Sequence, residues 1–332
     1  MKVAKLNKTY KSDPDQTVSN EYDTSHYQLY APGIMIINGL RGAGKTFLAS
    51  KYLIDAMKSN IYDRIYCISS TWNSNKGYFG KYIDEDDVYD ADRDAIDNVI
   101  RSVESDRDEF EQYLQDKKEY DEFLMKLKNK SITDEETDYY ESKGFLDEEF
   151  IAPKYKYKTV RAPQSLLIMD DIVGSQALMK SNNNNNILNL AVTNRHVAPL
   201  QEPYKNRSAC GLAIILLTQA YRTRTGGIAP PIRQNCTQLV LFANKSKPQV
   251  DLIKSELCSI IDGDKFDKAF AYATSEKHGS LLIDFKSKCP TMQFRKGLNE
   301  LIMFPDDECA CKCKNKLSTK TVKPVVGSFN DM

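Results

Sequence analysis

Residues 33–46 read Gly-Ile-Met-Ile-Ile-Asn-Gly-Leu-Arg-Gly-Ala-Gly-Lys-Thr, and this stretch decides the fold. Its first part, 33–38, is apolar without polar alternation, which is typical of a strand buried on both faces of a parallel sheet. Residues 45–58 carry apolar side chains at helical spacing. Between strand and helix, residues 39–46 match the pattern G-x-x-x-x-G-K-[ST]. This order predicts a phosphate-binding loop, called the phosphate loop below.

The residue types of the phosphate loop define its expected chemistry. Backbone N–H groups of a glycine-rich loop point at phosphate oxygens, and the helix N-terminus adds partial positive charge. Lys45 is expected to reach the β- and γ-phosphates of ATP, and the Thr46 hydroxyl to ligate Mg²⁺. A glycine turn without a ligand is the alternative. The residues expected to bind the nucleotide are Gly39, Arg41, Gly42, Ala43, Gly44, Lys45, Thr46 and Phe47.

A second apolar run, residues 165–169, ends in the carboxylates Asp170 and Asp171. At the end of a strand that lies near a phosphate loop, the first carboxylate would hold Mg²⁺. The second would orient or deprotonate the attacking water. A helix cap within a turn is the alternative for this pair. We therefore expect Asp170 to be a metal ligand and Asp171 to be catalytic.

Other apolar runs, separated by helical segments, complete an α/β pattern. The sequence predicts a mostly parallel sheet flanked by helices, with a closing hairpin near the C-terminal end. Gln219 follows one of these strands, so it is expected to hydrogen-bond the attacking water or a phosphate; a strand-end loop residue is the alternative. The runs are 64–69, 212–217, 238–242, and 281–285 with 292–295.

Two arginines precede predicted strands and are candidates for a role between subunits. Arg195 lies ahead of the strand 212–217, and Arg233 lies ahead of 238–242. Either could reach a neighbouring subunit's nucleotide, where an arginine finger stabilises charge on the transferred phosphoryl group. A surface salt bridge or a DNA phosphate contact is the alternative for each.

The charge of the chain is unevenly distributed. The 46 basic and 46 acidic residues cancel, but residues 84–149 hold 25 of the acidic and 9 of the basic residues. The remainder therefore holds 21 acidic and 37 basic residues, an excess that favours a polyanionic partner. Residues 84–149 show helical spacing, and we expect an acidic helical insert separate from the sheet. It would serve as a solvated hairpin, a partner-binding arm or a mask over a DNA-binding surface.

The ends of the chain differ from its centre. Cys309, Cys311 and Cys313 form a C-x-C-x-C pattern, but a zinc site usually pairs two such clusters, so a free or oxidisable tail is favoured over zinc. The sequence contains no run of about 18 apolar residues, so we predict no membrane span. The expected organisation is an N-terminal arm, a divided ATPase core, the insert and a flexible Cys/Lys-rich tail. The boundaries are 1–29, 30–83, 84–149, 150–304 and 305–332.

A family likeness emerges from the order of these motifs. The phosphate loop is followed by Cys67-Ile68-Ser69-Ser70-Thr71-Trp72, by Leu167-Ile168-Met169-Asp170-Asp171, by Asn194-Arg195-His196, by Thr218-Gln219 and by Ile232-Arg233-Gln234-Asn235. Apart from the insert, residues 30–300 resemble the genome-packaging ATPases of large eukaryotic DNA viruses, such as poxviruses and virophages, in the FtsK–HerA group.

The resemblance implies a function and partners. It implies a RecA-like sheet of the P-loop NTPase type and a homo-oligomeric ring, pentamer or hexamer, with a trans arginine finger. Such a ring would move double-stranded DNA by ATP hydrolysis. A capsid or portal vertex protein would be a further partner, and the expected location is the viral factory in the host cytoplasm. The acidic insert departs from the family pattern and puts a simple transfer of ring packing in doubt. The alternatives are a helicase or remodelling ATPase, or a nucleotide-dependent switch or scaffold without motor activity.

Overall fold

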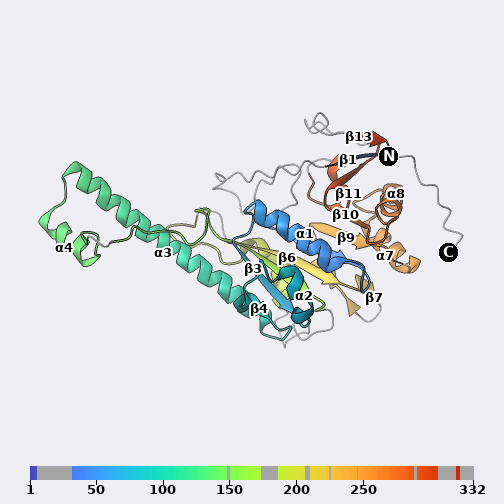
Figure 1. The fold of residues 1–332 in the computed structure, drawn as a ribbon, viewed down its shortest axis with the longest axis horizontal. Coiled ribbons are helices and arrows are strands. Elements are labelled where there is room, and N and C mark those ends of the chain that lie inside the picture. Colours follow the sequence, from blue (N-terminus) through green and yellow to red (C-terminus); the bar gives the residue numbers. More distant parts are fainter. Residues whose placement is uncertain are drawn as a thin grey trace.

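The computed structural model centres on one large sheet with helices on both faces (Figure 1). Six neighbouring strands are parallel, and five more extend the sheet antiparallel. The order along the sheet is β13-β1-β12-β11-β10-β9-β2-β6-β5-β3-β4. The residues that the structure describes are 1–5, 32–147, 150–172, 186–205, 210–223, 226–244, 246–287, 290–305 and 319–321.

The parallel strands set the position of the site. The strand of the phosphate loop, β2, lies beside β6, and β6 lies beside β5, which ends in Asp170. The ends of β2, β6, β5 and β3 form one side of the sheet, called the carboxyl edge below; the opposite side is the amino edge. The predicted α/β class, with a mostly parallel central sheet and flanking helices, is confirmed. The parallel strands are β9 (Gln238–Phe242), β2 (Ile34–Asn38), β6 (Gly211–Thr218), β5 (Gln164–Asp170), β3 (Arg64–Ser69) and β4 (Val88–Tyr89).

The antiparallel part contains the predicted closing hairpin. β10 pairs with β11, as the apolar runs 281–285 and 292–295 predicted. β10 also pairs with β9, which joins the hairpin to the parallel strands. The antiparallel strands are β10 (Ser280–Asp284), β11 (Phe294–Lys296), β12 (Glu300–Met303), β1 (Lys2–Lys5) and β13 (Thr319–Thr321). A separate two-stranded ribbon pairs β7 (Arg222–Thr223) with β8 (Gly226–Gly227).

Strand β2 explains why residues 34–37 are an apolar run without polar alternation. All five of its residues are buried, because the sheet is covered on both faces. Ile34 and Ile36 belong to one hydrophobic cluster with α3, α5, α7 and α8, while Met35 and Ile37 belong to a second cluster with α1. The remaining helices are α1 (Lys45–Lys58), α2 (Trp72–Phe79), α5 (Asn186–Thr193), α6 (Pro230–Gln234), α7 (Lys247–Leu257) and α8 (Gly263–Ala273), with short 3-10 turns η1 (Glu85–Asp87), η3 (Asn194–His196) and η4 (Pro290–Met292).

The long helix α3 (Ala95–Asn129) begins in the core and ends far from it (Figure 1). Its buried residues as far as Phe110 belong to the main hydrophobic cluster. The fully buried Asp106 carboxylate accepts from Arg64 at 3.1 Å, from Lys156 at 2.7 Å and from the Tyr66 hydroxyl at 3.3 Å. This network fixes the first third of α3 to the start of β3.

Beyond the core, α3 folds back through α4 (Asp134–Ser142) as a projection, called the distal hairpin below (residues 115–147 and 150–151). A capping box between Thr133 and Glu136 starts α4. The projection is held together by aromatic rings whose centroids lie 4.9 to 6.3 Å apart. These rings belong to Tyr120, Phe123, Tyr140, Phe145 and Phe150. The distal hairpin therefore has a small core of its own.

Three predicted boundaries are wrong. The segment 84–149 is not separate from the sheet, because β4 pairs with β3 and the first part of α3 is core. Residues 2–5 of the predicted arm and 319–321 of the predicted tail are strands of the sheet, paired through β1 with β12 and β13. Apolar spacing alone missed them, because short edge strands depend on the neighbours that they pair with. Cys309, Cys311 and Cys313, and with them the zinc hypothesis, lie outside the described residues.

Candidate nucleotide site

The phosphate loop joins β2 to α1 at the carboxyl edge. A Cβ atom at Gly39 would lie 2.9 Å from the Cβ atom of Phe242, so only glycine fits there. Gly42 and Gly44 have φ values of 77° and 109°, in the left-handed region that favours glycine. Gly44 is also the N-cap of α1. The glycines of the predicted motif thus permit a close turn that ends at a helix N-terminus.

Lys45 spans the phosphate loop. Its Nζ atom donates to the carbonyl oxygens of Gly39 at 2.8 Å and Leu40 at 3.2 Å. Burial lowers the pKa of Lys45, while the negative charges of Asp170 and Asp171 partly offset that effect. A partly desolvated cation beside a glycine loop can bind phosphate oxygens strongly, because water screens it less.

Asp170 ends β5 and is 5% exposed. The Asn75 side chain of α2 donates to its Oδ2 atom. Burial raises the pKa of Asp170, the neighbouring charge of Asp171 raises it further, and Lys45 opposes both effects. Ionised Asp170 is therefore held at a cost that a cation at the site would reduce.

The residues present fit Mg²⁺ bound together with a nucleotide. Mg²⁺ is usually held by one or two carboxylates, a hydroxyl, water and substrate phosphates rather than by an all-protein cage. Asp170 supplies a carboxylate, and Thr46 supplies a hydroxyl at the start of α1. Within the described ranges, no group of three or more His, Cys, Asp or Glu residues could hold a metal. The donor set thus suits a cation whose remaining ligands come from a nucleotide.

Asp171 and Gln219 meet because β5 and β6 are neighbours. Gln219 Nε2 donates to Asp171 Oδ1 at 3.1 Å, and both side chains are exposed. Asp171 has a φ of 53°, an unfavourable conformation for a residue with a side chain. Local strain of this kind is often found at functional sites. The sequence placed these two residues at one edge, and the structure brings their side chains into contact.

Sequence reasoning missed four side chains at this edge. Thr71 and Asn75 follow β3, and Asn75 donates to the Thr71 hydroxyl at 3.2 Å as well as to Asp170. Phe242 packs against the phosphate loop, and His278 contacts it. The adjacency of β3 and β5 is the signal that would have found Thr71, because their carboxyl ends must meet.

The two arginine candidates differ in their surroundings. The Arg233 side chain is 9% exposed, and its Nε atom donates to Glu256 of α7 at 2.8 Å. Its guanidinium also lies over the Tyr221 ring and donates to the Ile228 carbonyl. These contacts use Arg233 within the subunit and favour the salt-bridge alternative for it.

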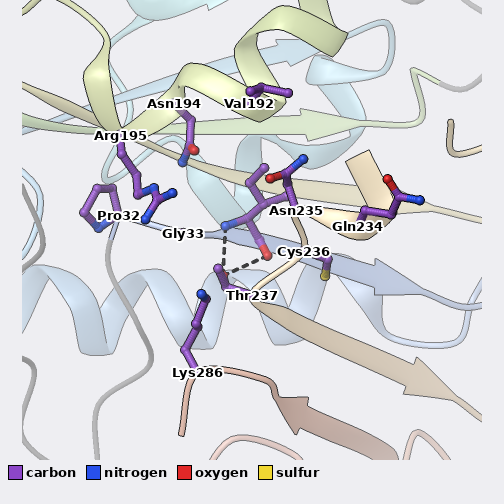
Figure 2. A pocket seen from close by; sticks show the side chains of 11 residues that line it. Pro32, Gly33, Val192, Asn194, Arg195, Gln234, Asn235, Cys236, Thr237 and Lys286 are labelled. Carbon is purple, nitrogen blue, oxygen red and sulfur yellow. Dashed lines mark hydrogen bonds between the residues drawn. The ribbon is translucent and has the colours of Figure 1, made fainter. Parts of the chain in front are cut away.

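Arg195 lines a pocket at the amino edge, away from the phosphate loop (Figure 2). The pocket has a volume of about 90 Å³ and no acidic residue in its lining. Figure 2 shows the side chains of Arg195 and Lys286 approaching the start of β2. Gln234 and Asn235, at the end of α6, complete the polar part of the lining. The motifs around residues 195 and 234 therefore converge here and not at the carboxyl edge.

No family model and no curated protein matches this chain in sequence. Among solved structures, it is similar to the genome packaging NTPase B204 from Sulfolobus turreted icosahedral virus 2. The complex with sulfate has 15% identity and a TM-score of 0.42, over 77% of this chain and 93% of that chain. The complex with ATP-gammaS has 15% identity and a TM-score of 0.40, over 80% and 97%.

A second similar structure is the pCW3 conjugation coupling protein TcpA, in a monomer form with ATPgS. It has 13% identity and a TM-score of 0.35, over 75% of this chain and 62% of that chain. In the described part of the chain, no helix is both long enough and apolar enough to cross a bilayer.

Proposed function

We propose that this chain is an ATP-hydrolysing translocase of double-stranded DNA that packages a viral genome into a preformed capsid. One observation carries the ATPase part: four side chains of complementary function meet at the carboxyl edge. Lys45 and Asp170 are both partly desolvated and lie close enough for their opposite charges to shift each other's pKa, and Gln219 donates to the neighbouring Asp171. A structural turn would not need a buried carboxylate next to a strained, exposed one.

The side chains suggest how the site would work. The phosphate loop would bind the β- and γ-phosphates through backbone N–H groups, and Lys45 would exchange its carbonyl contacts for phosphate oxygens. Asp171 would orient the attacking water and accept its proton, while Gln219 keeps the carboxylate in place. When bound, Mg²⁺ would neutralise charge on the phosphates; Asp170 and Thr46 would hold it.

The charge outside the segment 84–149 supports DNA as the polymer. That part of the chain holds 37 basic and 21 acidic residues, and basic surfaces bind nucleic acid through its phosphates. The resemblance to viral packaging ATPases in the order of the sequence motifs supports double-stranded DNA as the polymer and a ring, pentamer or hexamer, as the assembly. A capsid or portal vertex partner and a viral factory in the host cytoplasm belong to the same proposal.

Arg195 is the first candidate for a trans arginine finger, because the Arg233 guanidinium is held within the subunit by Glu256 and the Ile228 carbonyl. An arginine finger is worth about 10³–10⁵ in rate. We expect Arg195→Ala to lower turnover sharply with nearly unchanged ATP affinity. Mixing this variant with Lys45→Ala protein should restore part of the activity, because some interfaces in a mixed ring join an intact loop to an intact arginine. No recovery, together with no effect of Arg195→Ala alone, would remove the finger from the proposal.

The central experiment measures steady-state ATPase activity with and without double-stranded DNA, over a series of salt concentrations. A motor on DNA should be stimulated, and the stimulation should fall with salt as phosphate contacts weaken. Hydrolysis without any response to DNA would favour a nucleotide-dependent switch. Strand separation without translocation would favour a helicase.

A further inference from the structure

His278 lies at the carboxyl edge although it is far from the phosphate loop in sequence. It precedes β10, and β10 runs antiparallel to β9, with Ser280 opposite Phe242. The start of β10 therefore meets the ends of the parallel strands. There, His278 Nδ1 lies 3.0 Å from the carbonyl oxygen of Ala43 in the phosphate loop. A carbonyl oxygen only accepts, so Nδ1 carries the proton and donates.

The backbone at His278 is unfavourable for its side chain. Its φ is 63°, in the left-handed region that glycine and asparagine tolerate best. A tight turn imposes this conformation: the N–H of Gly279 donates to the Glu276 carbonyl at 2.9 Å. A histidine held in a strained turn with its ring on a functional loop points to a role for the ring.

The hydrogen bond acts on one peptide unit of the phosphate loop. The Ala43 carbonyl and the Gly44 N–H belong to the same planar trans unit, so they point in opposite directions. Fixing the carbonyl toward His278 therefore fixes the N–H direction away from His278. Gly44, with its φ of 109°, is the residue whose orientation needs such fixing, because glycine has the widest choice of conformations.

We propose that His278 is a positioning residue for the nucleotide: it holds the peptide between Ala43 and Gly44 so that the Gly44 N–H is aimed at the β-phosphate. This inference rests on the proposed nucleotide site. His278 touches neither substrate nor metal in this role; it acts through the loop. The contact also joins the turn between α8 and β10 to the phosphate loop.

Two substitutions separate the ring from the backbone. His278→Gly removes the donor and relieves the strain at φ 63°, while His278→Asn tolerates that φ and keeps a donor close to the Nδ1 position. One neutral hydrogen bond corresponds to an affinity change of about threefold to tenfold. We expect the glycine variant to bind ADP that much more weakly, and the asparagine variant to bind it within about twofold of the wild type. The loss should be smaller for AMP, which lacks the β-phosphate.

Calorimetric titration of the full chain with ADP and AMP, with denaturant unfolding alongside, decides the matter. Weaker ADP binding by the glycine variant, rescue by asparagine and an unchanged unfolding midpoint would support positioning. Equal ADP affinity of all three proteins would overturn it, as would a loss that asparagine does not rescue. If the wild-type protein binds no ADP, the proposed function itself fails, which is a different result.

Discussion

The pKa values of carboxyl groups at the carboxyl edge and in the distal hairpin are shifted in opposite directions. Burial and the charge of Asp171 raise the pKa of Asp170. In the hairpin, hydrogen bonds from the Lys126 side chain and the Thr133 backbone lower the pKa of Glu136. The Gln115 and Lys143 side chains do the same for the pKa of Glu119. The same chemical group is thus destabilised as an anion in one region and stabilised in the other.

The difference teaches where this fold is arranged for stability and where it is arranged for binding. The hairpin satisfies its charges locally through a capping box and ion pairs. The carboxyl edge instead combines a partly desolvated lysine, a raised carboxylate and positive φ at Asp171. Functional sites commonly retain such unfavourable features, since a ligand relieves them. Changes at the edge should therefore affect turnover, and changes in α3 or the hairpin should affect stability or nothing.

The largest effect is expected from deletion of the whole segment 84–149, and a shorter deletion is its control. Removing 84–149 should prevent folding, because β4 and the first part of α3 are lost from the core. Replacing only 116–150 with a four-residue Gly-Ser linker should leave folding and ATP turnover intact, since the aromatic cluster there is self-contained. Circular dichroism and ATPase assays check both. If the protein with the shorter deletion fails to fold, the distal hairpin is part of the folding core, and the two regions are not independent.

Lys45→Ala should reduce ATP turnover to background, because the phosphates lose their counter-charge. The unfolding free energy should change little, since burial already disfavours the Lys45 cation. Lys58→Ala, an exposed lysine in the last turn of the same helix, is the matched control and should keep full activity. Steady-state phosphate release gives the measurement. Substantial activity in the Lys45 variant would contradict the proposed site.

Asp171→Asn should lower turnover by about 10²–10⁴, the range for loss of a general base. Asparagine tolerates φ 53° and can still accept from Gln219, so the geometry of the edge should survive. Nucleotide affinity should stay near the wild-type value. The checks are single-turnover hydrolysis and a binding titration; near-normal hydrolysis would assign the base to another residue.

Asp106→Ala should lower the unfolding free energy by about 3 kcal/mol, the low end for breaking a buried ion pair, because Arg64 and Lys156 keep some contact with water. Asp108→Ala, an exposed carboxylate on the same helix, is the control and should cost about 0–1 kcal/mol. Urea unfolding measures both. Equal effects would mean that the buried network does not anchor α3.

The smallest expected effect is the contribution of Asp170 to the pH dependence of the unfolding free energy. Because the pKa of Asp170 is raised by folding, the folded protein binds this proton more tightly than the unfolded chain. The unfolding free energy therefore falls as pH rises from the ordinary carboxyl pKa of about 3.9 to the raised value. Asp170→Asn should remove this fall and leave the unfolding free energy at pH 7 equal or slightly higher. Urea unfolding from pH 4 to 8 checks this; a steeper fall in the variant would contradict the stated cause.

Much of the fold was predictable, because the parallel strands are apolar runs that burial on two faces requires. The phosphate loop and the pair Asp170 and Asp171 were predictable for a similar reason, since local spacing defines them. Strand β4 was not, because its two residues stand within an acidic run and pair only where β3 offers an edge. Nor was Asp106, which looks like any acid of that run until Arg64 faces it.

The partners that complete the site could not be read from local patterns. His278 is 235 residues from Ala43, and Asn75 is 95 residues from Asp170. Such pairs follow from strand order and direction, which a single sequence does not state. The resemblance to viral ATPases named the motifs at residues 195 and 234, but the structure was needed to show that they share a pocket.

Because α3 is long, its distal end lies far from the point where the helix is fixed to the core (Figure 1). The buried Asp106 fixes the helix to Arg64, the first residue of β3. From Asp106 to Asn129 the helix continues for about 35 Å at 1.5 Å per residue. A tilt of about 10° at Asp106 would sweep the tip through roughly 6 Å over that length. A small change in the direction of α3 at Asp106 would therefore become a displacement of several ångströms at the distal end of the helix.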